Sequence, residues 1–288
     1  MTLAHQYLVK PCDAATLRAT LENALNLRDI LDDPSLTALM GRIVSLPSVP
    51  TVYLKLMDAL RSDETPVAAI GDIIAEDLAM SAKVLQWVNS PLFGARRPFT
   101  SPREAAIYLG VDVVRAMALT ESVFAQYDAG PNPCFSVEEL RNHSLQVATV
   151  ARELAQSRHL PQSVVNDVFL GGLMHDLGKL VLGSNFPGQY REVAACFQDP
   201  EAARAKELQL FGTTHAEVGG YLLWLWGISG KATEIVVRHH SAGPETPEGQ
   251  GPPGLVALAD AMVRQGARQG ARDVLAPRPE SLPHEVTQ

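Results

Sequence analysis

The chain has 288 residues, of which 46% are hydrophobic and 19% charged, as in packed globular proteins and unlike disordered ones. Its 24 Lys and Arg residues against 32 Asp and Glu residues give a net charge of −8. This acidic balance argues against a dedicated binder of nucleic acid or anionic membranes, which would carry a basic surplus.

The three cysteines, Cys12, Cys134 and Cys196, are widely separated and form no Cys-x-x-Cys pair. Their spacing argues against a disulfide framework and a cysteine zinc site, and it indicates a reducing compartment. No apolar run reaches the roughly 18 residues of a membrane span. The first residues also lack the basic and apolar stretches of a signal peptide. We therefore expect a cytoplasmic protein without membrane partners.

Residues 1–31 have a pattern of their own. His5–Val9 alternates like a short strand, Lys10-Pro11 follows, and Asp13 is placed to cap a helix. One strand and one helix cannot bury each other's apolar faces or close a sheet. This segment is therefore predicted to be the end of a larger domain.

From residue 35 onward, nearly all periodic segments predict helices. Pro50 suits the first turn of one helix. Ser101 and Ser136 each open a capping box, with a glutamate three residues later. Gly110 separates the helix that follows Ser101 from a second one over residues 111–126. The apolar stripes of these segments indicate the core of an all-α protein.

Two stretches rich in proline and glycine divide this helical pattern. The sequence Gly-Pro-Asn-Pro at 130–133 is the best internal boundary, between predicted lobes at 36–130 and 131–264. Residues 244–253 predict a loop, and residues 265–288 predict a flexible tail.

Several histidines and aspartates lie in or beside apolar helical segments. His175-Asp176 follows an apolar run at a helix end, where both side chains can face one cavity. Imidazole with carboxylate suits Zn, Mn, Fe or Ni. Taken singly, His143 could be a hydrogen-bonded core histidine, Asp176 a turn cap, and Asp260 the partner of an arginine. The candidate metal ligands are His143, His175, Asp176, His215, His239, His240 and Asp260.

Lys179 ends the segment MHDLGK that contains the His-Asp pair. It could face a phosphate, but the favoured interpretation is a helix-end lysine whose charge reaches solvent. The residues alone show neither an open coordination position nor a group that orients a phosphate, so no catalytic residue is assigned.

The segment AHQYLVKPCDAATLRATLENAL, residues 4–25, resembles the last strand, Lys-Pro turn and final helix of a two-component receiver domain. It covers about a quarter of that family's length. Lys10 matches the lysine that contacts the phosphorylated aspartate, but the positions that would match the phosphoacceptor lie outside this sequence. The resemblance implies a response regulator as parent, with a histidine kinase as partner only where the full receiver is present.

The order of the candidate ligands resembles the HD superfamily of metal-dependent phosphohydrolases. His143, His175-Asp176 and Asp260 match its pattern of a histidine, an HD pair and a later aspartate. The additional histidines match those of HD-GYP phosphodiesterases, and Lys179 matches the lysine of the HDxGK motif. Ser241 stands where that subfamily has an acidic residue, and no Gly-Tyr-Pro follows, which argues against cyclic di-GMP as substrate.

Three runs in the front half resemble HDOD domains, the HD-related output domains of bacterial signalling proteins. They are SLPSVPTVYLKLMDAL, IIAEDLAMSAKVLQWVNSPLFG and TSPREAAIYLG, and the resemblance extends over residues 36–264. It implies a two-lobed helical domain with an HD-type second lobe. It also implies a regulatory output that acts through contacts with other signalling proteins.

Three functions remain open from the sequence. The favoured one is a non-catalytic output module, with one or two divalent ions as possible occupants of the HD pocket. The second is a metal-dependent phosphohydrolase, and the third is a module that senses a nucleotide or a metal. No nucleic-acid partner is expected.

Overall fold

The computed structural model describes residues 33–48, 51–59, 66–93, 97–127, 134–228, 230–240 and 251–266. Within these ranges all regular elements are helices, which confirms the all-α prediction. The predicted receiver segment at 1–31, the boundary at 130–133 and most of the predicted tail lie outside the described residues.

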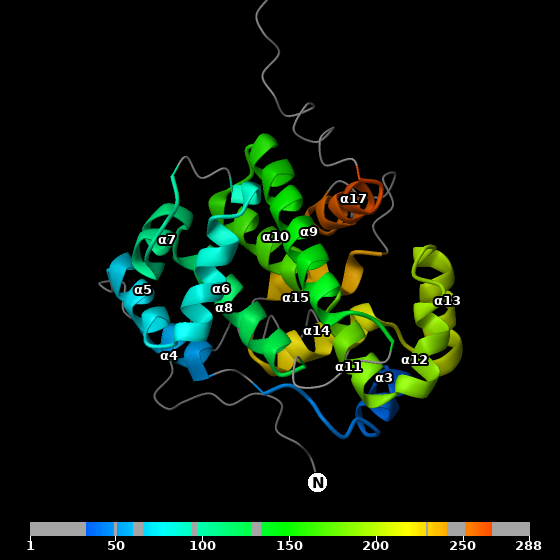
Figure 1. Ribbon diagram of the computed structural model, residues 1–288. Helices are drawn as coiled ribbons and strands as arrows, with labels where there is room; N and C mark the ends of the chain where they lie inside the picture. Colours follow the sequence, from blue (N-terminus) through cyan, green and yellow to red (C-terminus); the bar gives the residue numbers. More distant parts are fainter. Residues whose placement is uncertain are drawn as a thin grey trace, which may run out of the picture.

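The helices, labelled as in Figure 1, follow one another along the chain without an intervening strand in the described ranges. Their bounds are α3 (Pro34–Met40), α4 (Thr51–Ala59), α5 (Val67–Ala75), α6 (Leu78–Val88), the 3-10 turn η1 (Pro91–Phe93), α7 (Pro102–Leu109), α8 (Val111–Ala125), α9 (Val137–Ser157), α10 (Gln162–Met174), α11 (Leu177–Asn185), α12 (Pro187–Ala194), α13 (Pro200–Phe211), α14 (His215–Leu225), α15 (Gly230–Arg238) and α17 (Pro252–Arg264).

Helices α4 to α8 gather on one side of the molecule, and α11 to α13 lie on the other (Figure 1). Between them, α10 packs against both α8 and α9, while α17 lies on α9. Helix α3 lies on the second side of the molecule, where it packs on α14. The side-chain oxygen of Asn185 fixes the segment that follows α3, because it accepts hydrogen bonds from the amides of Val44 and Ser45 at 3.1 and 3.0 Å.

Several helix ends follow directly from local sequence. The Ser101 hydroxyl accepts a hydrogen bond from the Glu104 amide, and Ser136 does the same for Glu139, as both capping patterns predict. Gly110 adopts a φ of 87°, which favours glycine, and it joins α7 to α8 where the sequence predicted a break. Local side chains therefore position α7, α8 and α9.

The predicted loop over 244–253 is wrong at its end. Pro252 and Pro253 form the first turn of α17, which begins at Pro252. A first helical turn tolerates proline because its amides have no partner within the helix. The structure thus extends this helix toward the loop and places Asp260 in its middle turns.

Two apolar cores hold the helices together. The larger one extends from α3 and α4 through α8 to α14 and includes fully buried Phe124, Phe169 and Leu180. The smaller one joins α9, α10, α15 and α17 through side chains such as Val147, Ile235 and Val256. No helix in the described part of the chain combines the length and apolar character needed to cross a membrane.

Candidate metal centre

The His-Asp pair lies at the junction of two helices. His175 follows the last residue of α10, and Asp176 is the N-cap residue of α11, with both side chains buried. This sharp junction lets adjacent residues face the same interior space, as the sequence predicted for a helix end. The Asp176 side chain makes no capping hydrogen bond, so its carboxylate is free to face the other candidate ligands.

His143, His175 and Asp176 form the first ligand group. One ligand atom of each lies within 4.8 Å of the others. His175 Nε2 is 3.3 Å from Asp176 Oδ2, and His143 Nε2 is 3.9 Å from the same oxygen. The group combines two imidazoles and one carboxylate, a donor set that suits Zn, Mn, Fe or Ni.

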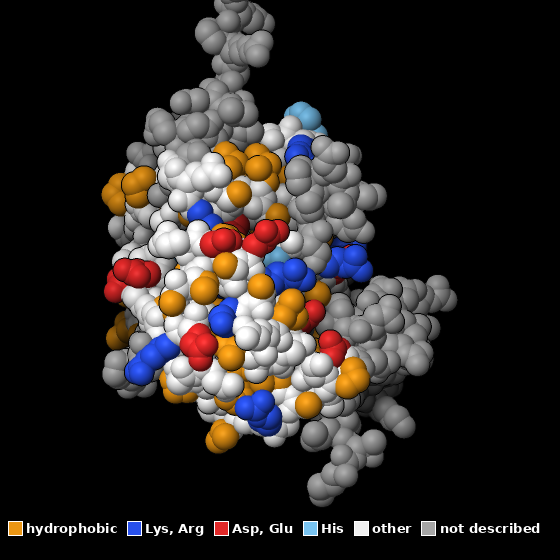
Figure 2. Space-filling model, turned by 90° about the vertical axis from the view of Figure 1, so that its right-hand side faces the viewer, with side chains coloured by type: hydrophobic (Ala, Val, Ile, Leu, Met, Phe, Trp, Pro, Cys, Tyr) orange, Lys and Arg blue, Asp and Glu red, His pale blue; other side chains and the backbone are white. Residues whose placement is uncertain are grey.

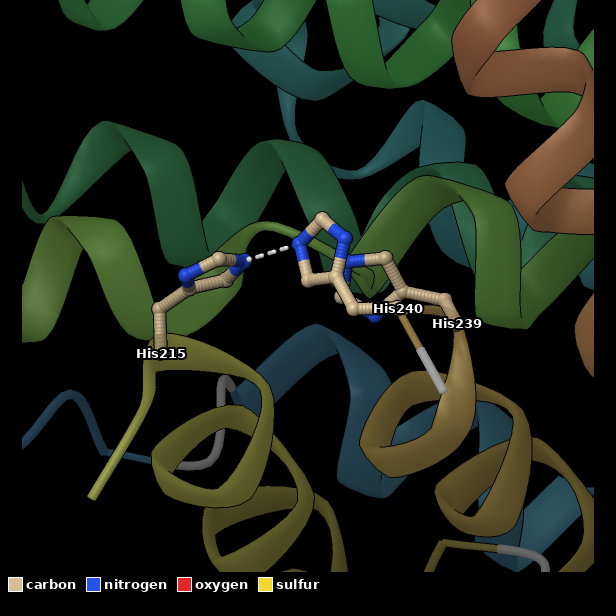
Figure 3. Close-up of side chains that lie close together, drawn as sticks. All are labelled: His215, His239 and His240. Carbon is tan, nitrogen blue, oxygen red and sulfur yellow. Dashed lines mark hydrogen bonds between the residues drawn. The ribbon is translucent and has the colours of Figure 1, made fainter. Parts of the chain in front are cut away.

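His215, His239 and His240 form the second ligand group (Figure 3), again with their ligand atoms within 4.8 Å of one another. His215 opens α14, whereas the other two lie in the turn just after α15. The Nε2 atoms of His215 and His240 face each other at 3.0 Å (Figure 3). His215 Nε2 is also 3.3 Å from Asp176 Oδ1, so Asp176 connects the two groups.

Close packing of α11 on the start of α14 brings the groups together. A Cβ atom built on Gly178 would lie 1.9 Å from the backbone oxygen of His215, which leaves space only for a hydrogen. Glycine at this position therefore lets His215 approach Asp176. The Gly of MHDLGK is a structural requirement of the site.

Hydrogen bonds at Nδ1 fix the tautomers of three histidines. His175 Nδ1 donates to the carbonyl of Gly172 at 2.7 Å, and His239 Nδ1 donates to that of Val236 at 2.6 Å. His215 Nδ1 donates to a carboxylate oxygen of Glu207 at 2.7 Å. Because carbonyl and carboxylate oxygens only accept, each neutral ring carries its proton on Nδ1 and has a lone pair on Nε2.

These lone pairs provide the test of whether a metal ion fits. Nε2 of His175 and Nε2 of His239 are buried and have no hydrogen-bond partner among the described residues. Buried polar atoms without partners are costly, and a cation at each ligand group would satisfy the nitrogen that belongs to that group. Histidines that donate Nδ1 to an oxygen and direct Nε2 inward have the arrangement of metal-bound imidazoles. The residues therefore fit a divalent cation.

Lys179 corrects the expectation of a solvent-reaching lysine. Its side chain is buried, and its ammonium group lies 2.8 Å from Asp176 Oδ2. Burial alone would raise the pKa of Asp176, but the neighbouring side chains of His175 and Lys179 hold it well below the usual value. Asp176 is therefore an anion at neutral pH, as a metal ligand must be.

Asp260 lies beside the first ligand group but is already paired. Its Oδ1 is 2.8 Å from His143 Nε2, and both carboxylate oxygens accept hydrogen bonds from Arg264 Nε at 2.9 and 3.0 Å. Burial raises the pKa of Asp260, and the hydrogen bond with His143 lowers it, with a net shift below the usual value. Asp260 thus forms a salt bridge with Arg264 and also lies next to His143, a member of the first ligand group.

Burial also sets the charge of two histidines of the second ligand group, His239 and His240. It lowers the pKa of His239 to about 3, with a further contribution from His175 and His215. It likewise lowers the pKa of His240, with His239 as the next cause. Both rings are neutral at pH 7, which is the state that binds metals. His215 differs: burial would lower its pKa, but the carboxylates of Glu207 and Asp176 raise it above the usual value.

Glu207 is the buried acidic residue of this region that the sequence did not reveal. It lies on α13, 1% exposed, and accepts hydrogen bonds from the backbone amide and the ring of His215. Burial raises its pKa, but His215 and a hydrogen bond from Tyr190 lower it below the usual value. The only sequence signal was an acidic residue eight positions before a candidate histidine, which is too weak to use.

A cavity of about 630 Å³ opens onto the first ligand group. His143, Asp176, Lys179 and Arg264 line it together with the aromatic rings of Phe135 and Phe197. On the face shown in Figure 2, basic and acidic side chains are interspersed among apolar ones over the described surface. The lining of the cavity thus offers the cations Lys179 and Arg264, and part of the first ligand group, to a molecule that enters from solvent.

The chain is similar to known proteins both in sequence and in structure. The model of the HDOD domain family matches residues 46–242. An HDOD domain protein of unknown function from Geobacter sulfurreducens has a similar structure, with a TM-score of 0.63 and 29% identity over 79% of this chain and 76% of that one.

A cyclic di-GMP phosphodiesterase of Pseudomonas aeruginosa is 27% identical over 180 residues, which are 59% of this chain and 39% of that protein. An uncharacterized protein of Treponema pallidum is 23% identical over 233 residues, which are 79% of this chain. The chain spans 44% of the length of that second relative, so it matches less than half of either curated protein.

Proposed function

We propose that this chain, which belongs to the HDOD domain family, binds two divalent metal ions and hydrolyses a phosphoester in the cavity beside them. The observation that carries the proposal is the pair of three-residue ligand groups connected by Asp176. Pairs of neighbouring divalent ions occur in phosphatases, polymerases and nucleases, where they stabilise the attacking and leaving oxygens of a phosphoryl group.

The residues present would divide the ions between the two groups. His143, His175 and Asp176 would hold one ion, and His215, His239 and His240 the other. Divalent ions at such a site stabilise the charge that develops on a phosphoryl group and lower the pKa of water. Asp176 is anionic and would balance the positive charge of both ions.

The cavity supplies what a phosphoester needs on the protein side. Lys179 and Arg264 present positive charge to the same space as His143. Their pairing with Asp176 and Asp260 fixes both side chains at the wall of the cavity. We assign these two cations to binding and orienting the anionic phosphate, and the aromatic side of the cavity to the rest of the substrate.

A second candidate function is a regulatory output domain that acts through contacts with other signalling proteins and has no turnover. The same two salt bridges favour it, because Lys179 and Arg264 already neutralise the carboxylates that a metal would need. Membership of the HDOD family supports this candidate as well. The two candidates differ in whether metal and turnover are present.

Turnover of a generic phosphodiester separates the two candidates. Purified full chain is supplied with Mn²⁺ or Fe²⁺ and bis(p-nitrophenyl) phosphate, and release of nitrophenol is followed by absorbance. We expect metal-dependent turnover that disappears in His175→Ala and persists in His159→Asn, a change at an exposed histidine outside both ligand groups.

Circular dichroism checks that both variants keep the helical fold. A wild type with neither bound metal nor turnover would support the output-domain candidate, whereas bound metal without turnover would support a module that senses a metal. Turnover that survives in His175→Ala would contradict the assignment of the site.

A further inference from the structure

We propose that Glu207 is a positioning residue that holds His215 as a ligand of the second metal ion. This inference rests on the proposed metal-binding function. It assigns a role to a residue of α13 that lies outside both ligand groups and outside the cavity wall.

Glu207 and His215 are joined by two hydrogen bonds. Glu207 Oε2 accepts a hydrogen bond from the backbone amide of His215 at 2.9 Å and from ring Nδ1 at 2.7 Å. Tyr190 donates its hydroxyl to the other carboxylate oxygen at 2.8 Å. All three side chains are 3% exposed or less. The start of α14 and the ring plane of His215 are therefore fixed by one carboxylate, which is itself fixed by a tyrosine.

The position of His215 in its helix explains why this carboxylate is needed. His175 and His239 follow the last turns of α10 and α15, and each donates Nδ1 to a backbone carbonyl three residues earlier. His215 is the first residue of α14, so no preceding helical turn offers it a carbonyl. Its acceptor has to come from another element, and α13 supplies it through Glu207.

A carboxylate acceptor also differs chemically from a carbonyl. A negative charge at Nδ1 increases the electron density of the ring, which makes Nε2 a stronger ligand, and it holds the tautomer that exposes the Nε2 lone pair. His215 Nε2 is the atom that faces both His240 and Asp176. Glu207 therefore acts on the ion that binds at the second group, at the point where the two groups meet.

The test is a titration of the chelator-treated full chain with Co²⁺, followed by the visible absorption of the bound ion and by calorimetry. The wild type is expected to show two binding steps. Glu207→Gln keeps the shape of the side chain but removes its charge, and it should weaken one step 10- to 100-fold while the other stays unchanged. Glu201→Gln, an exposed change in the same helix, serves as the matched control.

A double variant distinguishes positioning from a general loss of structure. In a His215→Ala background, Glu207→Gln should cause no further loss of Co²⁺ affinity, because its partner ring is gone. An equal loss in both backgrounds would overturn the inference. Tyr190→Phe should weaken the same step by a smaller factor, and it provides the test if Glu207→Gln does not fold.

The outcomes separate this inference from the function on which it rests. A wild type that binds no Co²⁺ would overturn the proposed function and this inference with it. A wild type with two steps, and Glu207→Gln and Tyr190→Phe variants with the same two affinities, would overturn the role of Glu207 alone.

Discussion

The front helices α4 to α8 and the back helices α9 to α17 are built from the same kind of segment but bury different chemistry. Within the described residues, Glu121 is the one acidic or basic side chain that α4 to α8 bury. The back helices bury His175, Asp176, Lys179 and Glu207 together with further ligands. An apolar core needs only volume and pattern, whereas a buried polar cluster is costly without partners. The back half therefore contains the candidate site, and the front half packs against α10 through α8.

The largest effect is expected from a cavity in the front core. Phe124 on α8 is 1% exposed, and Phe124→Ala should lower the free energy of unfolding by about 3–5 kcal/mol. Urea unfolding measures this change. Leu54→Ala, at a side chain that is 54% exposed, is the control and should change stability by about 0.5 kcal/mol or less. Equal effects of the two variants would contradict the assignment of the core.

A smaller effect on stability, with a larger one on the site, is expected at Gly178. The added methyl of Gly178→Ala would meet the backbone of His215, so α11 and α14 must separate. We expect a loss of about 1–3 kcal/mol in unfolding free energy and a clear loss of metal affinity. Gly188→Ala on α12 has open space for its methyl group and should leave both quantities unchanged or slightly improve stability. Unchanged metal affinity in Gly178→Ala would show that the close approach is unimportant.

Acid should act on the metal-free protein through His239 and His240, the two buried histidines whose pKa values lie below the usual value. The pKa of His239 is about 3 in the folded chain and about 6.5 when unfolded. Between these values the unfolded chain binds more protons, so unfolding free energy falls as pH falls. His239 alone should contribute about 2 kcal/mol of loss between pH 7 and pH 5.

Chemical unfolding in chelator at both pH values measures this loss. His239→Gln should show a flatter dependence on pH than the wild type. His159→Asn, at an exposed histidine, should keep the wild-type dependence. The same slope in His239→Gln and the wild type would contradict a buried, neutral imidazole.

The sequence predicted most where the cause is local. Ser101, Ser136 and Gly110 determine helix boundaries through their own backbone contacts, and these predictions are confirmed. Pro252 misled because proline suits both a loop and a first helical turn. Lys179 misled because its ammonium group pairs with buried Asp176 and lies over the ring of Phe197, a contact between residues that are apart in the sequence.

The supporting residues of the site were the least predictable. Glu207 lies on a helix whose sequence, PEAARAKELQLF, shows polar residues around much of its surface. Its role depends on the packing of α13 beside the start of α14, which no local pattern encodes. The candidate ligands were recognisable because histidines stood out among apolar residues and followed the order of a known family. Their grouping around Asp176 needed the structure.

Metal content is the most direct test of the central claim that two ligand groups share Asp176. The full chain is purified without chelator, supplied with Mn²⁺ or Fe²⁺, desalted, and measured by plasma mass spectrometry. Two divalent ions per chain are predicted for the wild type, and one for His239→Ala, which disrupts only the second group. A wild type that binds one ion or none, or a His239→Ala variant that still binds two, would contradict the claim.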